Sequence, residues 1–209
     1  MGWFDFTRSP KAGAIDTRTI PLFPLNTVLF PDGIQPLKVF EQRYLDMTAR
    51  CMQAEQPFGI CLIDQGSEVG SAARPHQIGT LAQIGQWDME QLGILTMTVS
   101  GGRRFRIGET RVLDNQLLEA SVTLLDDTPV PLPPSSQRLL PLLRRVIGDM
   151  GAQRMPEPHR YDDAAWVGYR LTEILPVQAL AKQKLLELED PLIRLEILEK
   201  FLDQRKLLD

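Results

Sequence analysis

The stretch that decides the fold runs from Ile20 to Tyr44 and reads IPLFPLNTVLFPDGIQPLKVFEQRY. Two apolar runs in it, Thr27–Phe30 and Ile34–Val39, predict strands separated by a turn at Pro31-Asp32-Gly33. Proline has no N–H to donate to a neighbouring strand, so in sheets it is confined to edges, strand starts and bulges. The four prolines of the stretch therefore predict a bent β segment with the character of an edge.

The same stretch continues into a helix without an intervening loop. The spacing of apolar residues predicts a helix over about residues 40–55, which ends before Gln56-Pro57 because a residue that precedes proline avoids the α conformation. Phe58–Ile63 has the length of a buried strand, and the Gly- and Ser-rich segment Asp64–Pro75 is expected to be a mobile loop. The residues at the helical spacing are Phe40, Tyr44, Met47 and Cys51.

Four more strand-like segments follow at a spacing of about ten residues, which is typical of a curled antiparallel sheet or a small barrel. Gly101-Gly102 is a candidate for the hairpin turn between the second and the third segment. The segments are residues 76–87, 92–101, 103–114 and 117–126.

The segment Asp126–Ser136, DDTPVPLPPSS, marks a boundary because its four prolines favour an extended connector. Beyond it the apolar period becomes helical. The first helix is expected to start at an N-cap, Ser136, and to end at Gly151, and the last to start at Asp190-Pro191. Two further helices are expected between them. The expected divisions are an N-terminal tail (1–18), a β-rich part (19–126), a linker (127–136) and a helical part (137–209).

The composition is that of an ordinary globular chain of 209 residues, 43% hydrophobic, with a formal net charge of −4. This mild acidity argues against a protein that binds a phosphate backbone through a basic face. The N-terminal tail lacks a long apolar run, so neither a signal peptide nor a membrane span is expected, and we expect a cytoplasmic location. Its aromatic residues, Trp3, Phe4 and Phe6, are candidates for docking onto the body.

Motifs that would indicate catalysis are absent from the sequence. It has no GxxxxGK[ST], GxSxG, HExxH or CxxC pattern, and His76 and His159 lack a metal-ligand spacing. We therefore expect no catalytic residue, no cofactor and no metal. Cys51 and Cys61 are expected to be buried free thiols. Of the paired carboxylates, Asp162-Asp163 fits a helix N-terminus and Asp126-Asp127 is expected to be solvated.

Three groups of residues are candidates for binding. One group lies at the expected first turn of the helix and either fixes that junction or contacts a ligand. A basic run on a strand either binds phosphate or carboxylate, or faces water and pairs with nearby carboxylates. An apolar group around a hairpin tip forms a contact surface or covers the open end of the barrel. The groups are Glu41 and Arg43; Arg103, Arg104 and Arg106; and Trp87, Met89 and Leu92.

Several of these segments resemble the N-terminal substrate-binding domain of Lon proteases. The family's PLxPL, VLFP and PLxxFExRY patterns are met by residues 21–25, 28–31 and 36–44. IGTLAQI at 78–84, VSGGRRFRI at 99–107 and the helical run at 182–202 also resemble the family, in the same order. The resemblance covers about residues 19–205.

The resemblance implies an α+β fold: a PUA-like antiparallel pseudo-barrel with one internal helix, followed by a C-terminal helical bundle. The sequence ends at Asp209 without the ATPase and Ser–Lys protease modules of full-length Lon proteases, so we expect a stand-alone protein that is not an enzyme. The leading hypothesis is a module that binds peptide segments or a partner protein. The alternatives are an RNA-binding PUA-like protein, and a small-molecule-binding or hydrolytic protein that uses the groove between barrel and helices. The last alternative requires a deep polar pocket there that joins Glu41, Arg43 or His76.

Overall fold

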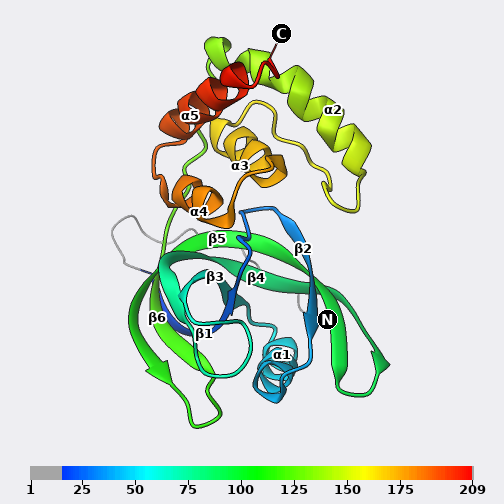
Figure 1. The fold of residues 1–209 in the computed structure, drawn as a ribbon, viewed down its shortest axis with the longest axis vertical. Coiled ribbons are helices and arrows are strands. Elements are labelled where there is room, and N and C mark those ends of the chain that lie inside the picture. Colours follow the sequence, from blue (N-terminus) through cyan, green and yellow to red (C-terminus); the bar gives the residue numbers. More distant parts are fainter. Residues whose placement is uncertain (1–15, 209) are drawn as a thin grey trace, which may run out of the picture.

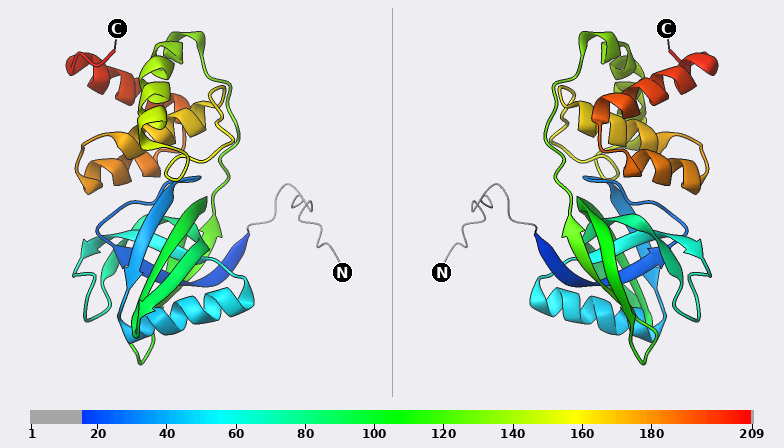
Figure 2. Two further views of the ribbon diagram at one scale, coloured as in Figure 1. Left: turned by 90° about the vertical axis from the view of Figure 1, so that its right-hand side faces the viewer. Right: turned by 90° about the vertical axis from the view of Figure 1, so that its left-hand side faces the viewer.

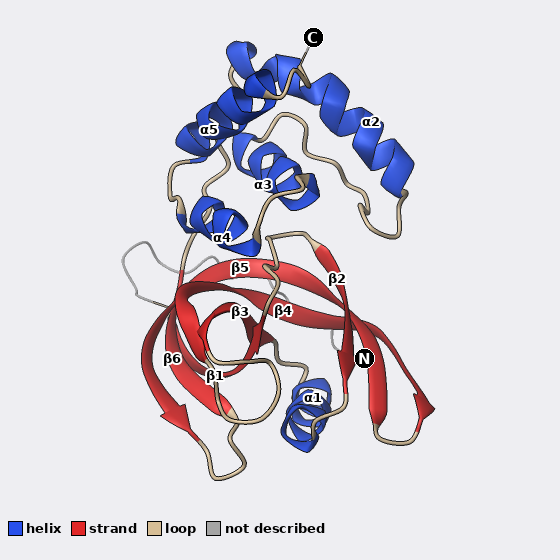
Figure 3. Ribbon diagram, in the orientation of Figure 1, coloured by secondary structure: helices blue, strands red, loops and turns tan. Residues whose placement is uncertain are grey.

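The computed structural model describes residues 16–208, apart from the side chain of Glu90. It has a mixed fold with a six-stranded sheet and five α-helices (Figures 1 and 3). The strands are β1 (Thr17–Leu25), β2 (Ile34–Val39), β3 (Phe58–Gln65), β4 (Arg74–Gln91), β5 (Ile94–Val112) and β6 (Leu118–Leu124). The helices are α1 (Gln42–Ala54), a 3₁₀ helix (Pro134–Leu139), α2 (Leu140–Met150), α3 (Ala164–Ile174), α4 (Ala179–Glu187) and α5 (Pro191–Gln204).

The sheet closes on itself. Its strand order is β2-β5-β4-β3-β1-β6, and a further pairing between β5 and β6 joins the ends of a ring that leaves out β2, which pairs with β5. All pairs are antiparallel except β1 with β3, a parallel pair that was not expected from the sequence. Parallel neighbours require a crossover connection, and the segment with β2 and α1 provides it.

The expected strand at Thr27–Phe30 is wrong, because the strand of this region is β1, which ends at Leu25. Pro21 and Pro24 lie inside β1 without breaking it. At Pro21 the strand pairs with β6 and at Pro24 with β3, so each proline has a neighbouring strand on one side. Thr17 and Arg18 of the expected tail already belong to β1, and the aromatic residues of the tail lie outside the described residues.

The expected hairpin turn at Gly101-Gly102 is also wrong, since β5 runs continuously through both glycines. Gly101 is where the loop after β1 crosses the strand. Its N–H donates to the carbonyl of Gly33 (2.8 Å), and its own carbonyl accepts from the N–H of Asp32 (2.7 Å). A Cβ atom at this position would lie 2.0 Å from the carbonyl oxygen of Phe30. The glycine thus permits a close backbone contact and does not form a turn.

The helix ends follow the sequence at most places. Asp163 and Asp190 cap α3 and α5, each accepting a hydrogen bond from the N–H two residues on, and Gly151 ends α2. The expected N-cap at Ser136 is wrong, because this serine lies inside the 3₁₀ helix that precedes α2. The four C-terminal helices gather at one end of the sheet, and α1 lies at the other (Figure 2).

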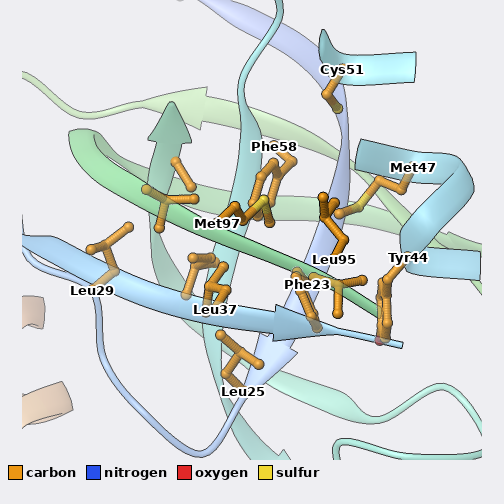
Figure 4. Packing of buried hydrophobic residues seen from close by; sticks show 14 of the residues in the cluster. Phe23, Leu25, Leu29, Leu37, Tyr44, Met47, Cys51, Phe58, Leu95 and Met97 are labelled. Carbon is orange, nitrogen blue, oxygen red and sulfur yellow. The ribbon is translucent and has the colours of Figure 1, made fainter. Parts of the chain in front are cut away.

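The main core lies between α1 and the sheet (Figure 4). Tyr44, Met47 and Cys51 of α1 are buried, as their spacing predicts, and the ring of Tyr44 stacks on that of Phe23 with 4.1 Å between centroids. Phe40 does not belong to this face, since α1 starts at Gln42 and Phe40 is exposed. A second core holds the helical part together around Leu143, Trp166, Leu171, Leu195 and Leu198.

Candidate functional site

Arg104, a predicted binding residue, lies in the contact between sheet and helices and makes its hydrogen bonds there. The side chain is 2% exposed. Its guanidinium donates to the carboxylate of Asp127 (2.6 and 3.1 Å) and to the carbonyls of Leu186 (2.6 Å) and Leu188 (3.0 Å). Asp127 also accepts from the hydroxyl of Tyr169, so the expectation that this carboxylate is solvated is wrong. Arg104 therefore orients the helical part on the sheet.

The other two arginines of the basic run lie nearer the surface, where they pair with carboxylates. Arg103 pairs with Asp16 (3.4 Å) and Asp126 (2.5 Å), and Arg106 pairs with Glu189 (3.1 Å). The run thus follows the alternative in which the arginines are paired with carboxylates. It leaves no unneutralised basic strip along β5.

Glu41 and Arg43 hold a loop. The buried guanidinium of Arg43 donates to the carbonyls of Gln116 (2.8 Å) and Glu68 (3.4 Å) and pairs with Glu41 (3.2 Å). The carboxylate of Glu41 accepts from the N–H of Gly70 and makes no capping bond to α1. Both residues thus tie the polar loop between β3 and β4 to the start of α1. The mobility of this loop stays a prediction.

The crevice between sheet and helices contains two hollows of about 280 and 370 Å³. Neither is lined by Glu41, Arg43 or His76, the residues that a polar site there was expected to use. The arginines that line them are paired, as Arg160 is with Asp32, and Arg170 with Glu173 (2.9 Å). Burial raises the pKa of the Glu173 carboxyl, and Arg170 opposes this effect. This arrangement offers no pair of nucleophile and base.

Groups for other chemistry are likewise occupied or dispersed in the described residues. His159 packs against the rings of Tyr161 and Trp166. Cys51 and Cys61 are free and buried, and burial raises the pKa of both thiols, so they are protonated at neutral pH. No group of His, Cys, Asp or Glu side chains within residues 16–208 has an arrangement that could hold a metal ion. Over the same range, no helix is long and apolar enough to cross a membrane.

The predicted apolar group lies together on the hairpin between β4 and β5. Trp87 is 57% exposed, Met89 44% and Leu92 99%. Leu92 and Gly93 form the turn, where Gly93 has a positive φ of 81°, and the hairpin extends away from the helical part (Figure 1). Their exposure contradicts the alternative that these residues cover the open end of the barrel, and it leaves their apolar side chains accessible at the hairpin tip.

The hairpin also has an open strand edge, which was not predicted from the sequence. β3 pairs with β4 only as far as Ala82, so β4 from Gln83 to Gln91 pairs with β5 alone among the described residues. Natural proteins block such edges with proline or lysine. The open edge of β2 carries both, Pro36 and Lys38, whereas residues 83–91 of β4 contain neither. The segment does carry the charged residues Asp88 and Glu90 and two register shifts against β5, so the absence of proline and lysine is the one signal of this edge in the sequence.

Two hollows adjoin this edge, and Trp87 lines both. One, of about 690 Å³, lies on the side of β4 away from β5, between the strand and the C-terminal end of α1. The other, of about 840 Å³, lies over the outer face of β2, β5 and β4 and is lined by Pro36, Thr96 and Thr98, among others. The exposed indole of Trp87 therefore borders both hollows, and a bound chain could occupy either of them.

Comparison with known proteins shows the family of the chain. The family model of the ATP-dependent protease La (LON) substrate-binding domain matches residues 19–204. The chain belongs to this family. A crystal structure of a Lon N-terminal domain protein from Xanthomonas campestris is 36% identical, with a TM-score of 0.74, and the match covers 88% of this chain and 98% of that one.

Two longer proteins are similar to this chain over part of their length. The Lon protease of Cytophaga hutchinsonii is 26% identical over 197 residues, which are 88% of this chain and 24% of that protein. Protein cereblon of Gallus gallus is 28% identical over 134 residues, which are 62% of this chain and 29% of that protein. The chain thus spans less than a third of the length of these relatives.

Proposed function

We propose that the chain is a non-enzymatic, cytoplasmic module that recognises exposed polypeptide segments of other proteins through the β4–β5 hairpin. The observation that carries the proposal is the group of exposed apolar side chains, Trp87, Met89 and Leu92, on one hairpin beside two hollows. Exposed apolar groups that gather in this way mark interaction sites. The family's name, a substrate-binding domain, supports the same function.

The proposal includes a finer description of the fold. The ring of five strands acts as a PUA-like barrel that displays the hairpin, and residues 137–209 act as a helical bundle fixed to it across the segment 127–136. The contacts of Arg104 with Asp127 and with the carbonyls of α4 support a fixed orientation between the two parts. A rigid support favours recognition, because the binding residues then lose little freedom on association.

Replacing Trp87 with alanine is expected to weaken the binding of a permanently unfolded test polypeptide about 30-fold, since an aromatic residue at the centre of an interface contributes about 2 kcal/mol. Fluorescence anisotropy of the labelled polypeptide measures this change. Leu92→Ala, at the exposed turn, should weaken binding while leaving the free energy of unfolding within about 0.5 kcal/mol.

The matched control is Leu180→Ala. Leu180 is 52% exposed but lies on α4, outside the hairpin, so its replacement should leave the affinity unchanged. Equal losses of affinity in Leu92→Ala and Leu180→Ala would locate binding elsewhere, and an unchanged affinity in Trp87→Ala would refute the role of the hairpin. No detectable binding by the unmodified chain would refute the proposed function itself.

Neither alternative function has an observation in its favour. The arginines that would contact RNA pair with Asp16, Asp126, Asp127 and Glu189, and the aromatic residue among them, Phe105, is fully buried and not available for stacking on bases. The hollows in the crevice between sheet and helices lack the predicted polar residues, as described above. Recognition of polypeptide at the hairpin is therefore the function that the site supports best.

A further inference from the structure

The backbone groups along the open edge of β4 can be assigned a direction. β5 lies between β2 and β4, and alternate residues of an antiparallel strand direct their N–H and C=O groups to opposite neighbours. Gly101 donates to Gly33, on the β2 side, so Val99 and Met97 also bond toward β2. The pairing of Pro36 with Thr98 agrees with this, because a proline cannot occupy a hydrogen-bonded pair that needs its N–H.

This alternation determines which groups of β4 remain free. Ile84 is opposite Val99, and Trp87 is opposite Met97, because a register shift between them sets three steps of β4 against two of β5. Because both β5 residues bond toward β2, Ile84 and Trp87 direct their own N–H and C=O groups away from β5 and toward the open edge. Gln83 and Asp88, opposite Ser100 and Thr96, bond to β5 instead. The edge thus presents free backbone donors and acceptors beside the hollow of about 690 Å³.

We propose that this edge binds an extended polypeptide segment as an additional strand, with backbone hydrogen bonds to Ile84 and Trp87. The inference rests on the proposed function and states how that function is carried out. Extended backbone is the ligand whose N–H and C=O groups match an open strand edge, and strand addition is an established mode of peptide recognition. Alternate side chains of the segment would then contact Trp87, giving a preference for apolar residues without requiring one sequence.

A charged residue near the edge, Arg50, indicates a second property of the expected ligand. A further hollow of about 560 Å³ shares Arg18, Cys51, Gln56 and Pro57 with the first, so the two form one groove around the C-terminal half of α1. Of the carboxylates that line it, Asp16 and Glu119 pair with arginines, whereas Glu55 makes no ion pair in the part of the chain that the structure describes. Arg50, which also lines it, has no carboxylate partner within residues 16–208. The preferred segment therefore carries a carboxylate beyond its apolar part, placed to meet Arg50.

The test uses synthetic peptides of alternating threonine and valine that end in aspartate. N-methylation of alternate residues removes the N–H groups on one edge of the peptide and leaves every side chain in place. Methylation of one set of alternate residues is expected to weaken binding at least tenfold, and methylation of the other set to leave it unchanged. The reason is that one edge of the peptide pairs with β4 and the other does not. Equal affinities of the two methylated peptides would overturn the proposal.

Amide hydrogen exchange in the full chain supplies an independent measurement. On binding of the peptide, exchange at Ile84 and Trp87 should slow by at least about tenfold, while Gln83 and Asp88, already bonded to β5, should change little. Binding without this protection would overturn strand addition and leave the proposed function intact. Slow exchange at both amides before peptide is added would also overturn it, since another part of the chain or a second copy would then occupy the edge.

The role of Arg50 is tested by replacing it with glutamine. Arg50→Gln should weaken the aspartate-ended peptide about threefold to tenfold and leave a peptide that ends in asparagine amide unaffected. An equal effect on both peptides would refute the charge contact. Failure of the unmodified chain to bind any unfolded polypeptide, by contrast, would refute the proposed function and the inference together.

Discussion

Gly101→Ala is expected to lower the free energy of unfolding by about 4 kcal/mol, a large share of the stability of a typical domain. The added Cβ would lie 2.0 Å from the carbonyl oxygen of Phe30, a backbone atom that cannot turn aside. The loop would have to move, and the two hydrogen bonds that join Gly101 to Asp32 and Gly33 would be lost or lengthened. Overpacking and the loss of these bonds contribute about 2 kcal/mol each.

Gly102→Ala is the matched control for this variant. A Cβ atom added at this neighbouring glycine would have the Cβ of Leu81 as its nearest atom, at 3.5 Å, which is an ordinary contact. Urea unfolding followed by circular dichroism should therefore show a much smaller loss for Gly102→Ala. Similar losses for both variants would mean that the strand disfavours any side chain here, and that the crossing loop is not the cause.

Arg104→Ala should lower the free energy of unfolding by about 3–5 kcal/mol, the usual result of removing one partner from a buried ion pair. The change leaves the carboxylate of Asp127 without its cation and the carbonyl of Leu186 without this donor, while the carbonyl of Leu188 keeps only its bond from Arg194. Because these groups come from the linker and from the end of α4, the helical part should separate first. Limited proteolysis of the segment 127–136 would detect this separation.

Arg106→Ala gives the comparison for Arg104. Arg106 lies two residues along the same strand and is also paired with a carboxylate, but its side chain is 52% exposed. An exposed ion pair contributes at most about 1 kcal/mol, so the two variants should differ by several-fold in their effect. Equal losses would show that burial is not what makes the Arg104 contact important.

Local signals predicted the elements whose ends are determined by their own residues. Asp190-Pro191 begins α5 and Gly151 ends α2, because capping depends on side chains within a few residues of the helix end. The buried apolar residues of α1, Tyr44, Met47 and Cys51, follow from spacing alone. Thr27–Phe30 has the composition of a strand, but Leu29 and Phe30 are buried in a loop. The carbonyl of Leu29 accepts a hydrogen bond there from the hydroxyl of Thr80. A partner 51 residues away decided that conformation.

The candidate site was predicted in part for the same reason. Trp87, Met89 and Leu92 surround a turn, so their common location on a hairpin could be read from the sequence. The open edge of β4 depends on where β3 stops pairing, which is a property of the whole sheet. Arg104 is buried because the helical part packs on β5 at that point, whereas Arg106 is exposed. The local sequence around the two arginines does not reveal this difference. The apolar residues could therefore be found from the sequence, and the backbone edge beside them could not.

The closed ring of strands has a consequence for how the chain is made. β1 pairs with β6, on the order of 100 residues later, and a ribosome adds about 5–20 residues per second. For several seconds or more, β1 and β3 have been synthesised while the strand that completes their sheet has not. Their apolar side chains, which include Leu22 and Phe58, stay without their final cover during that interval. Folding of the nascent chain should therefore depend on the speed of translation between β3 and β6, and on chaperones that hold the early strands.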